Sequence, residues 1–174
     1  TNALDYSESA PGHVALVCVP QKPVSTQVLL KPFTPVDVLE EVKKQAQNHM
    51  PAWATLHVRN PLFEEVQVDC RVKFRPEIKD TAFYLDVLHQ DLQAFLSPWV
   101  GTNAQALKFG WRVHKSSIIN FIDERPYIDF VRDVKINLIY GQGTNERMFN
   151  VDEAVPRFAI SVLSSSANHV LNLV

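Results

Sequence analysis

Residues 65–75 read Glu65-Val-Gln-Val-Asp-Cys-Arg-Val-Lys-Phe-Arg75, and every second side chain in this stretch is apolar. Because side chains alternate across a strand, the apolar set lies on one side and the charged or amide set on the other. A strand with one dry and one wet face is typical of antiparallel sheets, which can face water on one side. The stretch therefore predicts a long strand in an antiparallel sheet.

The composition is that of an ordinary globular protein. The chain has 174 residues, enough for one domain or two small lobes that share a core. Its formal net charge of −2 gives no electrostatic reason to expect nucleic acid or an anionic membrane as a partner. No apolar run is long enough to span a bilayer, and no signal peptide is visible. Since the chain begins with Thr1 and not Met, we interpret it as a processed or truncated piece of a longer protein.

Apolar periodicity and turn residues divide the chain into elements. Residues 1–12 are polar, end in Pro-Gly and are expected to be a leader or linker. Residues 13–174 are expected to form a single α+β domain, with possible sub-lobes at 13–100 and 101–174. The segment 141–156 is polar and reads as a loop. The expected strands are 13–19, 54–59, 65–75, 107–113, 127–140 and 158–163, and the expected helices are 34–50, 80–97 and 116–125.

The first six of the main elements follow the order of a ferredoxin-like βαββαβ core, to which extra C-terminal strands are added. This order predicts a mainly antiparallel sheet with two main helices on one face. Strands 54–59 and 65–75 would form a hairpin across Asn60 and Pro61. In the same topology, strand 13–19 would lie beside strand 65–75.

Two cysteines, Cys18 and Cys70, are too few for a disulfide framework or a zinc site. Both occur in apolar strand patterns, and the ferredoxin-like topology would bring them close together. Two interpretations remain open: a pair of buried reduced thiols, or one bridge between neighbouring strands.

The sequence contains no constellation that predicts catalysis. Glu65 and Asp69 share a face, but four strand residues separate them by about 13 Å, beyond the roughly 5–9.5 Å of a glycosidase pair. The six histidines show no metal-ligand spacing, and there is no Gly-x-Ser-x-Gly elbow. A lone Gly141-Gln142-Gly143 lacks the third glycine of a dinucleotide cradle. The face of strand 65–75 that is expected to contact solvent carries no aromatic side chains on which RNA bases could stack. We therefore expect no catalytic, cofactor-binding or metal-binding residue.

Two features indicate contacts with other proteins. Strand 13–19 is apolar on both faces, so it is either central or covered by a partner. Several aromatic residues lie near the ends of elements, where they are either core edges or interface anchors, since Trp and Tyr are favoured as buried interface contacts. The candidate interface residues are Trp53, Trp99, Trp111, Tyr127 and Phe130.

Short sequence motifs resemble the C-terminal part of the baseplate J-like proteins of contractile injection systems. The likeness extends from about Pro11 to Val162 and is most specific between Asn60 and Phe130. The motifs are Arg59-Asn-Pro-Leu-Phe-Glu-Glu-Val66, Val72-Lys-Phe74, Asp91-Leu92, Phe95-Leu-Ser-Pro-Trp99, Phe109-Gly110, His114-Lys-Ser-Ser-Ile-Ile-Asn-Phe-Ile122 and Arg125-Pro-Tyr-Ile-Asp-Phe130.

This resemblance implies a structural wedge component of the baseplate, without catalytic residues. Such proteins form a ring around a central hub and couple the sheath to the spike. The implied partners are other baseplate subunits (wedge, hub and sheath-proximal proteins), with self-association in the particle and without nucleic acid or membrane insertion. The implied location is the bacterial cytoplasm during assembly and then the phage-tail-like particle. The chain departs from the family in having Pro76-Glu-Ile-Lys79 where a Gly-rich turn is common, and its tail after Val162 matches nothing recognisable.

Two alternatives remain. One is a tail or baseplate component of an ordinary contractile prophage. The other is a small-molecule enzyme or binding domain with a site near the 141–156 loop, which a cleft with convergent polar groups would support.

Overall fold

The computed structural model describes residues 11–20, 30–99, 107–141 and 147–174. Most of the expected leader, 1–12, lies outside these residues, as do Gln142 and Gly143. The described chain is α+β, as predicted. Its elements are β1 (His13–Val17), α1 (Val36–Gln47), β2 (Thr55–Arg59), β3 (Leu62–Phe74), α2 (Thr81–Leu96), β4 (Val113–His114), α3 (Lys115–Asp123), β5 (Ile128–Tyr140), β6 (Arg147–Val151), β7 (Glu153–Ala154), β8 (Ser161–Ser165) and β9 (Val170–Leu173).

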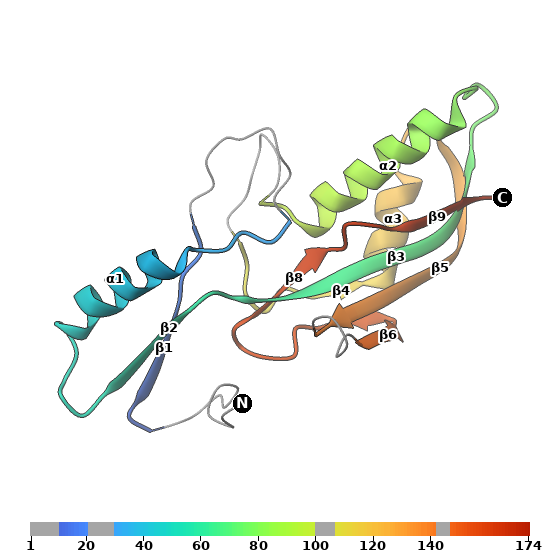
Figure 1. Cartoon of the computed structure of the whole chain (residues 1–174). Helices are drawn as coiled ribbons and strands as arrows, with labels where there is room; N and C mark the ends of the chain where they lie inside the picture. Colours follow the sequence, from blue (N-terminus) through green and yellow to red (C-terminus); the bar gives the residue numbers. More distant parts are fainter. Residues whose placement is uncertain (1–10, 21–29, 100–106, 142–146) are drawn as a thin grey trace.

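The main sheet is built around β3. Its strand order is β6-β5-β3-β8, and β9 pairs with β3 further along the edge that β8 occupies. The long β3–β5 pair and the β5–β6 pair are antiparallel, whereas β8 and β9 run parallel to β3. Figure 1 shows β3 and β5 curving together through the body of the molecule. The predicted antiparallel centre is therefore present, with parallel strands added on one side.

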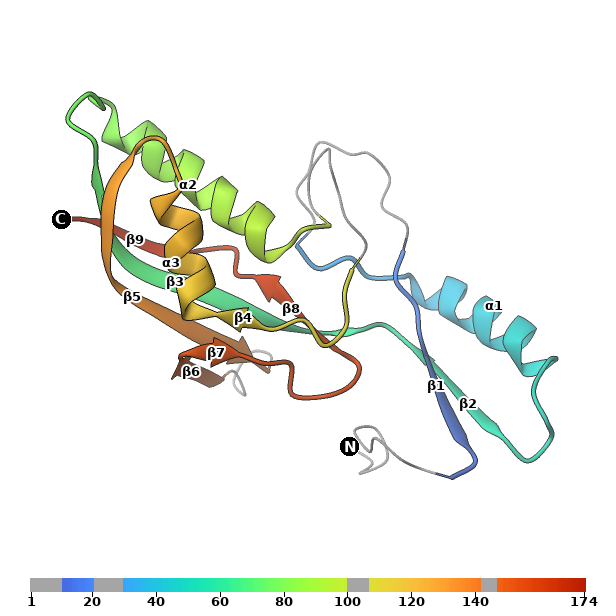
Figure 2. The ribbon, with the colours of Figure 1, turned by 180° about the vertical axis from the view of Figure 1, so that it is seen from behind.

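The alternation of β3 places its apolar row in the core. Val66, Val68, Cys70 and Val72 are fully buried, whereas the residues between them are half-buried or exposed. Helices α2 and α3 cover this face of the sheet (Figure 2). They contribute the fully buried side chains Leu88, Leu92, Leu96, Ile118 and Ile122.

Helix α2 begins where its sequence predicts. Asp80 is the N-cap, and its side chain accepts a hydrogen bond of 3.0 Å from the backbone N–H of Phe83. Such a cap satisfies one of the free N–H groups of the first turn. The helix ends at Leu96, just before Ser97-Pro98, because a residue that precedes proline disfavours helical geometry.

The ferredoxin-like arrangement is wrong in its strand pairing. β1 pairs in parallel with β2, and α1 forms the crossover between them. We call this unit the β1–α1–β2 lobe. Figure 1 shows the lobe at one end of the molecule and the main sheet at the other. The two helices on one face of the main sheet are therefore α2 and α3. Cys18 and Cys70 are both free thiols, so they do not form the bridge that was one of the two interpretations.

The expected hairpin between strands 54–59 and 65–75 does not form at Asn60 and Pro61. A tight hairpin needs residues that accept positive φ, whereas proline fixes a negative φ and holds the preceding residue extended. The side chain of Asn60 also accepts a hydrogen bond of 2.7 Å from the N–H of Thr34 and donates one of 3.0 Å to its carbonyl oxygen. The chain therefore continues in the same direction from β2 into β3, as Figure 1 shows.

The C-terminal part of the sheet extends beyond the predicted strands. The predicted strand 158–163 is observed as β8 (Ser161–Ser165), and β9 follows it. The segment 141–156, expected to be a loop, contains β6 and β7 among its described residues. The expected strand at 107–113 is reduced to β4, which has two residues and pairs with β7.

His169 holds the joint between β8 and β9 against β3. Its Nδ1 accepts a hydrogen bond of 3.1 Å from the N–H of Val68, so in the neutral ring the proton is on Nε2, which donates to Ser165 Oγ at 3.0 Å. From α2, His89 and Gln93 donate to the carbonyl oxygen of Ala167 at 2.9 and 3.1 Å. Burial, and then the neighbouring His89, lower the pKa of His169 to about 3.

We predict that His169 makes the fold sensitive to acid. The pKa of this group falls from 6.5 in the unfolded chain to about 3 in the folded one, so the unfolded state binds more protons between these values. Its contribution to stability is complete above pH 6.5 and decreases as the pH falls toward 3, by at most about 1.4 kcal/mol per pH unit. The His169→Asn variant keeps an acceptor for the Val68 N–H but does not titrate. Denaturant unfolding from pH 7 to 4 should show a smaller loss of stability in this variant, and parallel curves for both proteins would contradict the prediction.

We predict a large difference between two leucines. Leu92 is fully buried between α2 and the sheet, so Leu92→Ala should lower the free energy of unfolding by about 2–5 kcal/mol. Leu16 on β1 is 38% exposed, so Leu16→Ala should cost about 1 kcal/mol or less. Urea unfolding followed by circular dichroism measures both values. Equal destabilisation would show that the lobe is as well buried as the main core, against the structure.

Candidate functional site

The metal-ligating side chains of the described residues are dispersed, and the Cys70 thiol is buried in the core. Within those residues no group of three or more His, Cys, Asp or Glu side chains could hold a metal ion. Burial, and then the adjacent Asp69 carboxylate, raise the pKa of the Cys70 thiol to about 12, so it is not a thiolate nucleophile. None of the described helices is long and apolar enough to cross a membrane.

Ser165 and His169 are in contact but cannot act as a nucleophile and base. A general base must accept the hydroxyl proton at an unprotonated ring nitrogen. Here the free lone pair is on Nδ1, where it accepts the Val68 N–H, and Nε2 carries the proton. Ser165 Oγ instead donates to the carbonyl oxygen of Ser166 at 2.9 Å. The pair therefore fixes the C-terminal strands.

The region that includes Gly141 does have a cavity, of about 520 Å³. Its charged groups have partners within the chain. The buried Glu64 carboxylate accepts the N–H of Arg157, at 3.1 and 3.3 Å to its two oxygens, and Lys31 forms an ion pair with Glu65. The Arg157 guanidinium lies over the Tyr140 ring, 3.9 Å from its centroid. These internal partners do not favour a small-molecule site near residues 141–156.

The five candidate aromatic residues lie in different parts of the fold. Trp99 and Tyr127 are buried. Trp99 contacts Val162, and the Tyr127 hydroxyl donates a 2.6 Å hydrogen bond to Asp91. Burial, and then this hydrogen bond and the Asp91 charge, raise the pKa of Tyr127 far above its usual range. These two residues are positioned to stabilise the chain internally.

The other three candidates reach the surface. Phe130 is half-buried on β5, with Lys73 and Arg132 placed 5.2 and 4.8 Å from its ring centroid. Trp111 is half-buried before β4. Trp53 lies between α1 and β2 and is 77% exposed.

The β1–α1–β2 lobe carries a large share of the exposed apolar side chains. Helix α1 has no fully buried residue, and a two-stranded sheet is marginally stable by itself. We call the exposed apolar residues of this region the lobe surface: Val14, Leu16, Val19, Phe33, Val36, Val38 and Trp53. Several large apolar side chains exposed in one region of a fold are candidates for contact with another protein.

The free edge of β1 lacks the usual protection against pairing. Among the described strands, β1 pairs only with β2, so its other edge offers unpaired backbone N–H and C=O groups. Natural edge strands are protected by charges, prolines or bulges. The sequence His13-Val-Ala-Leu-Val17 contains no Asp, Glu, Lys, Arg or proline. By comparison β6, at the edge of the main sheet, begins with Arg147.

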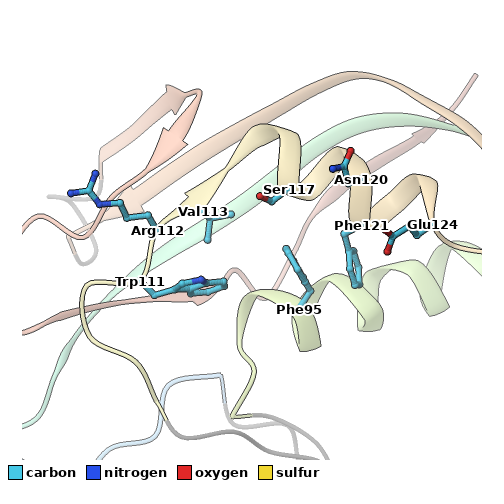
Figure 3. Close-up of a pocket in the computed structure, with 8 residues that line it drawn as sticks. All are labelled: Phe95, Trp111, Arg112, Val113, Ser117, Asn120, Phe121 and Glu124. Carbon is cyan, nitrogen blue, oxygen red and sulfur yellow. The ribbon is translucent and has the colours of Figure 1, made fainter.

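A second surface feature is a groove of about 400 Å³ between α2, α3 and the chain before β4. Figure 3 shows three aromatic rings, Phe95, Trp111 and Phe121, along this groove and polar side chains around it. We call it the aromatic groove. The sequence pattern indicates Trp111 as an interface residue but none of the groove residues of α3. The helical spacing of Ser117, Asn120 and Glu124 is the signal that would find them.

Comparisons with known proteins identify the family of the chain. A family model described as "Baseplate protein PVC11-like" matches residues 8–155. The chain is also similar to a solved structure, the six-fold symmetrised cryo-EM structure of the anti-feeding prophage baseplate, with a TM-score of 0.53 and 17% sequence identity. That match covers 79% of this chain and 27% of the other, so the chain spans about a quarter of that protein, and at this identity the likeness shows the fold alone. No curated protein matches the sequence.

The family match includes β1–β7 and all three described helices, and it covers most of the chain. The chain therefore belongs to the PVC11-like family of structural baseplate proteins, which points to a non-enzymatic role.

Proposed function

We propose that the chain is a wedge module of the baseplate of a contractile, phage-tail-like injection particle, of the baseplate J-like kind. In this role it joins neighbouring subunits in a ring around the hub and contacts other wedge, hub or sheath-proximal proteins, including copies of itself. It is assembled in the bacterial cytoplasm and then carried in the particle. The role requires neither nucleic acid nor membrane insertion.

The observation that carries the proposal is the lobe surface together with the free edge of β1. Both β1 and α1 leave apolar side chains in contact with water, although β1 is apolar on both faces and α1 is amphipathic. Burying apolar area stabilises by about 25 cal/mol per Å², so contact with another subunit supplies what the lobe lacks. Of the candidate aromatic residues, we propose Trp53, Trp111 and Phe130 as contacts, since Trp99 and Tyr127 are already buried within the chain.

We predict that Leu16→Lys prevents incorporation of the protein into particles. A charge in the middle of β1 blocks burial of this strand against a partner and leaves the core of the main sheet unchanged. Electron microscopy and sedimentation of particles purified from a producing strain would show loss of complete baseplates. Gln90→Lys, which adds the same charge at an exposed position of α2, is the matched control and should assemble normally.

Circular dichroism should confirm that both variants fold. Normal particles containing folded Leu16→Lys would contradict the role of the lobe surface in assembly.

A further inference from the structure

The floor of the aromatic groove consists of rings from three separate segments. Phe95 of α2 stacks on Phe121 of α3 with centroids 4.3 Å apart and planes 23° apart, and Trp111 lies across the groove (Figure 3). All three side chains are half-buried. Half-buried aromatic residues surrounded by polar groups are the anatomy of an interface contact, with an apolar centre and a polar rim.

The rim offers polar groups that are not used within the described part of the chain. Ser117, Asn120 and Glu124 follow one another along one face of α3, at spacings of three and four residues. No hydrogen bond or ion pair joins their side chains, or the Trp111 indole N–H, to any described residue. The groove therefore presents donors and acceptors to an incoming molecule.

The charges at the two ends of the groove differ. Figure 3 shows Arg112 at one end and Glu124 at the other. Arg112 lies 3.6 Å from the carboxylate of Glu153, so its charge is already compensated. Glu124 has no such partner among the described residues. The unbalanced charge of the groove is therefore the carboxylate of Glu124.

The position of Glu124 strengthens this negative end. It is the C-cap of α3, where the helix dipole already places partial negative charge. A carboxylate is unfavourable at a helix C-terminus, and the exposed Asp123 adds a second one. The nearby Arg125 has other partners: it donates to the Phe121 carbonyl oxygen, stacks on the Phe121 ring and lies 4.0 Å from Asp91. The exposed carboxylate of Glu124 is therefore available to a cation from another molecule.

We propose that the aromatic groove binds a short segment of a neighbouring baseplate subunit that carries an apolar side chain next to an arginine or lysine. The apolar side chain lies against Trp111 and Phe95, and the cation reaches Glu124. A volume of about 400 Å³ is within the roughly 300–1,000 Å³ of ligand pockets and exceeds what a lone cation needs. The inference rests on the proposed role in the baseplate, which supplies the neighbouring subunit.

The test uses three capped peptides as probes: acetyl-Ala-Phe-Leu-Arg-Leu-Ala-amide and its variants with citrulline or glutamate in place of arginine. Binding is followed by the indole N–H signal of Trp111 in NMR spectra, assigned with Trp111→Phe. The arginine peptide should shift this signal and bind up to about fivefold more tightly than the citrulline peptide, as expected for one ion pair with an exposed carboxylate. The glutamate peptide should bind more weakly still.

Glu124→Gln should reduce the affinity for the arginine peptide to that for the citrulline peptide and leave the citrulline affinity unchanged. Asp123→Asn removes a neighbouring carboxylate that does not line the groove and should change little. Equal binding of the three peptides, no shift of the Trp111 signal, or shifts caused by self-association of the chain would each overturn the proposal. If the Leu16→Lys variant fails to assemble while these peptides show no selectivity, the groove proposal fails and the baseplate role stands.

Discussion

The structure depends on β3 being paired along both of its edges while its apolar row is sealed by two helices. β5 occupies one edge, and β8 and β9 share the other. Because side chains alternate, this pairing commits Val66, Val68 and Cys70 to the core, and a slip of one residue would expose the whole row. The two helices thus cover the apolar row of β3. The β1–α1–β2 lobe and the aromatic groove are two parts of the described surface where apolar side chains stay exposed or half-buried.

These two surfaces differ in their physical character. The lobe surface is apolar and includes a free strand edge, so it suits extensive contact with another polypeptide backbone. The aromatic groove is smaller, has a polar rim and carries one uncompensated carboxylate, so it suits recognition of a particular side chain. A structural module that joins subunits needs both properties: buried area for affinity, and charge complementarity for the correct register.

The sequence predicted the centre of the fold because its pattern is local. The alternation in β3 and the Asp80 cap of α2 each involve adjacent residues, and both are observed. Strand pairing is not local: the parallel neighbours β8 and β9 come from about a hundred residues further along the chain. The prediction of a hairpin at Asn60-Pro61 is wrong because proline favours an extended chain, and the predicted position of β1 is wrong with it. Two features of the surfaces are visible in the sequence: the apolar character of both faces of β1, and Trp111. That Glu124 has no partner among the described residues cannot be read from the sequence, because it depends on which residues the fold brings next to α3.

Hydrogen–deuterium exchange of the β1 amides, residues 13–17, in the free chain and in assembled particles tests whether the lobe joins subunits. In the free chain, the amides on the unpaired edge should exchange rapidly while those of β3 remain protected. If the lobe joins subunits, β1 should become protected in the particle and β3 should change little. Rapid exchange of β1 in the assembled particle would contradict the account.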